Sequence, residues 1–145
     1  MTLSILSVPC LVGFQQMSKS KAIGTRGETT LVRFFESYGF KARRKALTGS
    51  KDEGDVELYW APRLSEPVCF EVKSGKQTAN PSRAQLEEWL KQARVEAENS
   101  GQRCMLVVLR YRRRTKDADV YLQYEGDWGP VREHLFLDEL AEEYK

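Results

Sequence analysis

The first part of the chain with a clear apolar spacing is residues 25–38, which fit one face of an α-helix. Apolar side chains recur there every three or four positions, at Leu31, Phe34, Phe35 and Tyr38. Thr25 is a residue type that caps helices, and Gly39 is a residue type that ends them. The pattern therefore predicts a helix over residues 25–38.

The rest of the chain alternates between strand-like runs and a second helical pattern. Strands are predicted at residues 41–47, 55–60, 67–74, 104–111 and 118–124, and the tail at 135–145 is expected to form a short strand and a helix. The second helix is predicted over residues 83–99, capped by Ser82 and stopped by Gly101. The apolar run 104–111 is expected at the centre of the sheet. The order α-β-β-β-α-β-β predicts an α/β fold with a mixed sheet flanked by helices.

Two opposite charges interrupt the third predicted strand, in the segment CFEVKSGK. Because side chains alternate along a strand, Glu71 and Lys73 lie on the same side of the sheet. Asp55 begins the preceding strand, directly after a glycine. If these two strands are neighbours, as their short connection allows, Asp55 and Glu71 approach within a few ångströms of each other.

Two adjacent carboxylates repel each other unless a cation lies between them, and Mg²⁺ is suited to that position. Such an ion activates water for attack on a phosphodiester. Lys73 is placed to orient or deprotonate that water and to offset the charge that develops on phosphorus. Glu28, on the first predicted helix, is a further acid, and it precedes Asp55, Glu71 and Lys73 along the chain.

Each of these residues also has an ordinary structural interpretation. Asp55 fits a turn, and Glu28 fits the acid preference of a helix N-terminus. Glu71 and Lys73 fit an exposed charge pair, and Gln85 fits a surface position on the second helix. Only the coincidence of all four charged residues favours a catalytic site.

Composition limits the classes of protein that fit. At 145 residues, with 41% apolar and 30% charged residues, the chain fits a single globular domain over residues 17–145. Residues 1–16 carry no charge and are expected to be a dispensable extension or an arm that packs on a partner. The single histidine argues against zinc or triad chemistry, and three cysteines without paired spacing indicate reduced thiols in a cytoplasmic protein. No membrane segment is expected.

Charge is distributed unevenly although the net charge is only +2. Residues 18–51 hold nine basic and two acidic residues, whereas residues 117–145 hold two basic and nine acidic residues. This asymmetry favours a polyanion-binding face, although a solvated basic surface is the alternative. The residues expected to bind DNA are Lys19, Lys21, Arg26, Arg43, Arg44, Lys45, Ser50, Lys51, Lys76, Arg83, Arg112 and Arg113.

The segments GDV, with Asp55, and FEVK, with Glu71 and Lys73, resemble the PD-(D/E)XK nuclease superfamily, whose core is α-β-β-β-α-β. Gly54 stands where the motif name has proline. The segment TRGETTLVRFFESYGF, with the basic strand and TGSKDEGD after it, is similar to archaeal-type and phage Holliday-junction resolvases. The resemblance covers residues 19–123.

This resemblance implies a restriction-endonuclease-like fold and a Mg²⁺-dependent endonuclease of DNA recombination and repair, in which Mn²⁺ can substitute. It implies that Glu28, Asp55, Glu71 and Lys73 are catalytic. The metal ligands are expected to be Asp55, Glu71, Glu28 and the backbone carbonyl of Val72. Ser50 in the loop and Gln85, in a helix motif with Trp89 in place of tyrosine, are accessory candidates.

The expected substrate is branched double-stranded DNA. Two symmetric nicks across a junction imply a twofold homodimer, and no small-molecule cofactor is expected. The alternatives are another nuclease of the superfamily, of flap, repair or restriction type, a catalytically silent DNA-binding module, and a structural protein with a chance motif.

Overall fold

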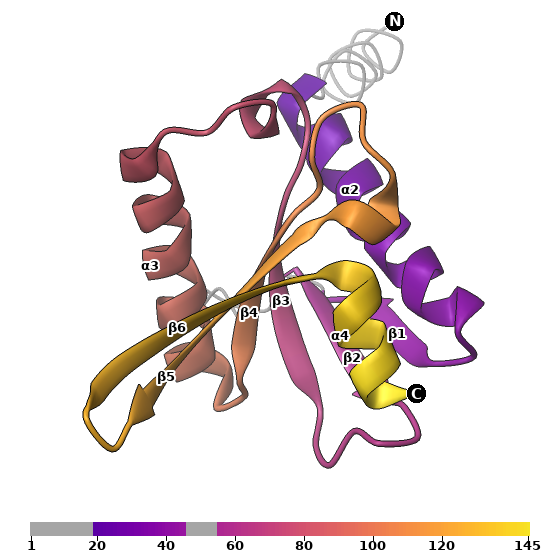
Figure 1. The fold of residues 1–145 in the computed structure, drawn as a ribbon. Coiled ribbons are helices and arrows are strands. Elements are labelled where there is room, and N and C mark those ends of the chain that lie inside the picture. Colours follow the sequence, from indigo (N-terminus) through magenta and orange to yellow (C-terminus); the bar gives the residue numbers. More distant parts are fainter. Residues whose placement is uncertain (1–18, 46–54) are drawn as a thin grey trace, which may run out of the picture.

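The computed structural model describes residues 19–45 and 55–145 and contains one six-stranded sheet flanked by helices (Figure 1). The strands are β1 (Lys41–Arg44), β2 (Val56–Trp60), β3 (Val68–Lys73), β4 (Cys104–Val108), β5 (Asp119–Gly126) and β6 (Gly129–Phe136). The helices are α2 (Lys19–Ser37), α3 (Arg83–Ser100) and α4 (Leu137–Tyr144), with 3₁₀ turns η1 (Lys76–Thr78) and η2 (Thr115–Asp117).

The strands lie in the sheet in their order along the chain, from β1 to β6. Strands β3 and β4 are parallel and are joined through α3, whereas every other neighbouring pair is antiparallel. The predicted mixed α/β sheet is therefore confirmed. The predicted central position of the fourth strand is also confirmed, because β4 is buried at all five positions.

Helices cover both faces of the sheet, with α3 on one face and α2 and α4 on the other (Figure 1). Leu31 and Phe35 of α2 pack with Phe70 of β3 in the larger core, which also includes Leu137 of α4. Trp89 and its neighbours on α3 pack against Cys69, Cys104 and Leu106 in the smaller core. Alternate residues of β3 therefore serve different cores, as the period of two requires.

The first helix is longer than predicted, because α2 begins by Lys19 rather than at Thr25. Gly24 and Gly27 lie within it, although glycines usually weaken a helix. A Cβ atom on Gly27 would lie 2.5 Å from Ser74 Oγ, so the glycine permits α2 to contact the end of β3. Tertiary packing thus outweighs the local propensity.

The second helix agrees with the prediction. The Ser82 side chain accepts a hydrogen bond from the Gln85 N–H, and Gly101 ends α3 with a left-handed φ of 70°. By contrast, β6 spans eight residues where only a short strand was predicted. Its residues are mostly exposed because it forms the edge of the sheet, so an alternating apolar pattern is weak.

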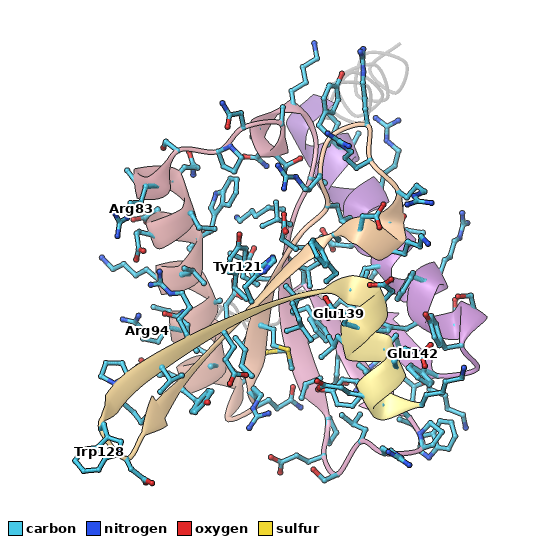
Figure 2. The ribbon with its side chains drawn as sticks, in the orientation of Figure 1. Arg83, Arg94, Tyr121, Trp128, Glu139 and Glu142 are labelled. Carbon is cyan, nitrogen blue, oxygen red and sulfur yellow. The ribbon has the colours of Figure 1, made fainter. Side chains whose placement is uncertain are left out.

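The last turn of α4 lies at the end of the sheet opposite the carboxyl end of β3. The carbonyl of Tyr144, in the last turn of α4, accepts a hydrogen bond from Arg63 N in the turn after β2. Figure 2 shows Glu139 and Glu142 of α4 on this side of the molecule. Among residues 19–45 and 55–145, no helix combines the length and apolar character that crossing a membrane requires.

Candidate active site

A pocket of about 450 Å³ lies at the carboxyl end of β3, between the first half of α2 and the turn that leads into η1. It brings together all four charged residues expected to be catalytic. The residues that line it are Ile23, Gly24, Glu28, Asp55, Glu71, Val72, Lys73, Ser74, Gly75, Lys76 and Gln77.

Asp55 is fixed in this pocket by the pairing of β2 with β3. Its backbone N–H donates to the Phe70 carbonyl at 2.9 Å, and its side-chain Oδ2 accepts from the Val72 N–H at 2.8 Å. Because Val56 is opposite Phe70 in this antiparallel pair, Asp55 is opposite Glu71. The prediction that these two strands are neighbours in the sheet is confirmed.

Glu71 and Lys73 form the pair that interrupts the apolar strand. Lys73 Nζ lies 3.3 Å from Glu71 Oε1, and the two side chains are 17% and 7% exposed. An ion pair at this degree of burial is screened less by solvent than a surface pair. The two charges therefore form a shielded pair in the lining of the pocket, rather than the exposed pair of the alternative interpretation.

Glu28 reaches the pocket from the other face of the sheet. Its Oε1 lies 3.3 Å from Arg44 Nε, so Arg44 faces Glu28. Arg43, on the opposite side of β1, bonds to Glu57 instead, with 2.8 Å between Arg43 Nε and Glu57 Oε1. Both arginines were predicted to bind DNA, and both hold a carboxylate in this structure.

The described residues contain no group of three Asp, Glu, His or Cys side chains that could hold a metal ion. Glu28, Asp55 and Glu71 thus share a pocket without forming the expected set of three ready carboxylate ligands, because Glu28 faces Arg44 and Glu71 faces Lys73. Mg²⁺ is commonly held by one or two carboxylates together with water and substrate phosphate. The donor set of Asp55 and Glu71 on neighbouring strands fits that pattern.

The backbone carbonyl of Val72 also fits this pattern of Mg²⁺ ligands. In a strand, the N–H and C=O of one residue point to the same side. Since the Val72 N–H donates to Asp55, the Val72 carbonyl also faces the β2 side of β3, where Asp55 lies.

The other residues expected to bind DNA are placed unevenly. Lys76 lines the pocket, whereas Arg26, Arg112 and Arg113 line a second pocket beside it. Arg83 is exposed at the start of α3, as Figure 2 shows. Lys45 is half-buried and its N–H donates to the Asp55 carbonyl. The side chains of Lys19 and Lys21, and all of Ser50 and Lys51, lie outside the described part of the structure.

Gln85 is not among the residues that line the pocket and is exposed in the first turn of α3. Of the three tryptophans, only Trp89 is buried. Trp60 is 47% exposed, and Trp128 is fully exposed at the tip of the β5–β6 hairpin (Figure 2). Residues 69 and 104 hold buried free thiols, as expected.

Sequence reasoning missed two polar groups, Gln77 and Glu57. Gln77 lines the pocket and donates to the Ser74 carbonyl at 3.0 Å. Glu57 is only 5% exposed, and its position two residues after Asp55 on the same strand could have predicted a shared face. Burial raises the pKa of Glu57, but hydrogen bonds from Gln102 and Arg43 outweigh burial and hold the pKa below its ordinary value.

No family model matches the chain, and no curated protein matches it in sequence. The structure does match that of Hjc from Archaeoglobus fulgidus, described as a Holliday junction resolvase from an archaeal hyperthermophile. The TM-score is 0.51 at 19% sequence identity, and the match covers 81% of this chain and 99% of Hjc. The chain has a resolvase-like fold. The fold expected from the sequence resemblance is thereby confirmed, and the pocket described above belongs to a resolvase-like sheet.

Proposed function

We propose that this protein is a Mg²⁺-dependent endonuclease that resolves branched DNA by paired symmetric nicks. The observation that carries the proposal is the juxtaposition of Asp55, Glu71 and Lys73 in one pocket of a resolvase-like fold. Acids on neighbouring strands and a shielded amine are groups that can support metal-assisted phosphodiester hydrolysis.

Asp55 and Glu71, with the Val72 carbonyl, would hold the metal ion. A bound Mg²⁺ lowers the pKa of water and offsets negative charge on the phosphate. Mn²⁺ is expected to substitute for it, because both ions accept oxygen ligands.

Lys73 supports hydrolysis in two ways. Its ammonium group, 3.3 Å from Glu71, orients that carboxylate before substrate binds. It also places a positive charge where the phosphate oxygens gain charge during the reaction. Glu28, which lines the pocket and faces Arg44, is proposed to position the attacking water.

The substrate is proposed to be a four-way DNA junction, bound through phosphate contacts by residues such as Lys76 and Arg83. Paired nicks require two active sites, so we propose a homodimer. The test is a comparison of four-way junction, flap and linear duplex, each incubated with wild-type protein and Mg²⁺. Paired nicks confined to the junction support the proposal. Preferential cleavage of flap or duplex would instead favour a nuclease with another substrate.

A catalytically silent DNA-binding protein is a second candidate, and one observation favours it. The carboxylates of Glu28 and Glu71 face basic residues, and the described residues hold no group of three potential ligands. The two candidates differ in the effect of Asp55→Ala. Loss of cleavage with retained junction binding supports the enzyme, whereas a wild-type protein that binds junctions without metal-dependent cleavage supports the silent module.

A further inference from the structure

A second pocket, of about 230 Å³, adjoins the candidate active site. It lies between α2, the turn after β3 and the loop that joins β4 to η2. The two pockets have Ile23, Ser74 and Gly75 in common, so these residues form a wall between them. A polymer lying over this wall would enter both pockets.

The wall depends on close contact between α2 and the turn. Gly75 has a left-handed φ of 84°, and a Cβ atom there would lie 2.8 Å from Ile23 Cγ2. Ser74 Oγ donates to the Ile23 carbonyl at 3.3 Å. The relative position of the two pockets is therefore fixed by packing and not by a long side chain.

The loop of the second pocket is rich in arginine and is held at both ends. Leu109 N donates to the Lys73 carbonyl at 2.8 Å, which ties the start of the loop to the candidate active site. Arg110 pairs with Asp119 at 3.3 Å, and Arg114 pairs with Asp117 at 2.9 Å. These two arginines thus stabilise the loop.

The remaining arginines of the pocket have a different setting. Arg26, Arg112 and Arg113 are exposed, and within residues 19–45 and 55–145 none of them forms an ion pair. No carboxylate of the described residues lines this pocket. Three guanidinium groups therefore converge on one small concavity without a counter-charge from the described chain.

Arg112 also has an unusual backbone. It is the only non-glycine residue of the described chain with a positive φ, at 58°, and its guanidinium lies 5.1 Å from the ring of Tyr111. A left-handed conformation is unfavourable for a residue with a Cβ, and such residues concentrate at functional sites. Stacking on Tyr111, which also lines the pocket, orders the guanidinium.

We propose that this second pocket binds a backbone phosphate of the same DNA strand that is cut in the first pocket. The inference rests on the proposed nuclease function, and it specifies how the strand is held. Guanidinium groups match phosphate oxygens in shape and charge. Because the two pockets have a common wall, a phosphate bound here sets which phosphodiester of that strand lies beside Asp55 and Lys73.

The test is a binding scan with junction DNA in which one phosphate at a time is replaced by an uncharged methylphosphonate. The assay is run with EDTA, so it does not depend on cleavage. The proteins are the wild type, Arg112→Gly, Arg113→Ala, Lys76→Ala as a marker of the first pocket, and Arg63→Ala as a control. Arg63 is an exposed arginine at the opposite end of the sheet.

We expect wild-type affinity to fall when a phosphate near the cut position is neutralised. The affinity of Arg113→Ala and of Arg112→Gly should not change when that phosphate is neutralised. The scan of Lys76→Ala should identify a phosphate in the same way, and the two phosphates should lie within a few nucleotides of each other. The slope of log K against log salt should become less steep by about 1 for each variant, as for one lost phosphate contact, but not for Arg63→Ala. Arg112→Gly should keep or raise the melting temperature, since glycine adopts a positive φ freely.

Two results would overturn the inference. The first is an unchanged scan in Arg112→Gly and Arg113→Ala. The second is a sensitive position on the other strand from the one found with Lys76→Ala. Displacement of DNA by inorganic phosphate beyond the effect of chloride at equal ionic strength, lost in Arg112→Gly and Arg113→Ala, would instead support a phosphate site in this pocket. Because binding alone is measured, a protein that never cleaves DNA would contradict the proposed function and leave this scan interpretable.

Discussion

The carboxylate of Asp55 accepts a hydrogen bond of 2.8 Å from the backbone N–H of Val72. This bond crosses from the start of β2 to β3 and places Asp55 beside the strand position between Glu71 and Lys73. A side chain held by a backbone group of a sheet moves little, so one wall of the pocket is already organised. Preorganised polar groups of this kind are an effective way to stabilise charge in a reaction.

Lys73→Met should abolish most cleavage without weakening DNA binding. The methionine keeps the length of the side chain but removes the ammonium group that lies 3.3 Å from Glu71. We expect the single-turnover cleavage rate to fall by a factor of about 10² to 10⁴, the usual contribution of one proton-transfer or charge-stabilising group. Lys91→Met, at an exposed position of α3, is the matched control and should cleave as the wild type does. Equal rates for the two variants would exclude a catalytic role for Lys73.

Alanine substitutions at two glycines of α2, three residues apart, should change the free energy of unfolding in opposite directions. A Cβ on Gly27 would lie 2.5 Å from Ser74 Oγ and 2.9 Å from Ser74 Cβ, so Gly27→Ala should lower the free energy of unfolding by about 1–3 kcal/mol. A Cβ on Gly24 would meet only Glu28 Oε2, at 4.0 Å, so Gly24→Ala should raise it by about 0.5–1 kcal/mol. Urea unfolding of both variants measures the difference. Similar values for the two would show that α2 does not pack on Ser74 in this way.

Glu57 should make stability depend on pH. Because hydrogen bonds from Gln102 and Arg43 hold its pKa below the ordinary value, the carboxylate stabilises the fold above the unfolded-state pKa of about 4.3. That stability is lost as the pH falls through the lower folded-state pKa. Glu57→Gln should therefore lower the free energy of unfolding by about 1–2 kcal/mol at pH 7. The difference from the wild type should shrink below about pH 4.

Urea unfolding across this pH range provides the measurement, with Glu66→Gln, an exposed residue in the turn before β3, as the control. A difference between the wild type and Glu57→Gln that stays constant down to pH 3 would show that the Glu57 charge does not contribute.

Alanine substitutions at a buried and at an exposed tryptophan should differ in their effect on stability. Trp89 is 3% exposed in the core beneath α3, so Trp89→Ala should cost about 3–5 kcal/mol. Trp128 is fully exposed at the tip of the β5–β6 hairpin, between Asp127 and Gly129, so Trp128→Ala should leave stability unchanged. Junction affinity should also be unchanged for Trp128→Ala, since the nearby acids disfavour DNA. A loss of junction affinity in Trp128→Ala would assign the hairpin tip to the DNA interface.

The sequence predicted the parts of the site that depend on strand alternation. The period of two placed Glu71 and Lys73 on one face, and a short connection made β2 and β3 neighbours, which brought Asp55 opposite Glu71. These relations are local in the sheet, so a pattern of residues is sufficient to find them.

Relations between distant elements were not predictable in the same way. Thr25, a residue type that caps helices, suggested a late start for the first helix, whereas α2 already includes Lys19. The close contact of Gly27 with Ser74 is visible only in the folded chain. Likewise, Arg43 and Arg44 lie on a basic strand, which suggested DNA binding. Their carboxylate partners, Glu57 and Glu28, lie 14 and 16 residues away along the chain, so the sequence did not reveal these pairs. The exposed edge strand β6 lacks the apolar alternation that marks buried strands.

The central claim is that Asp55 takes part in metal-dependent cleavage of a DNA junction. It is tested most directly by the single-turnover cleavage rate of a synthetic four-way junction as Mg²⁺ is titrated, for the wild type and for Asp55→Asn at matched junction occupancy. Asparagine keeps an oxygen that can accept the hydrogen bond from Val72, so the fold is expected to persist. We predict paired nicks by the wild type that increase with Mg²⁺ and disappear with EDTA, and no nicks by Asp55→Asn. Equal cleavage by the two proteins, or junction binding by the wild type without cleavage at any Mg²⁺ or Mn²⁺ concentration, would contradict the account.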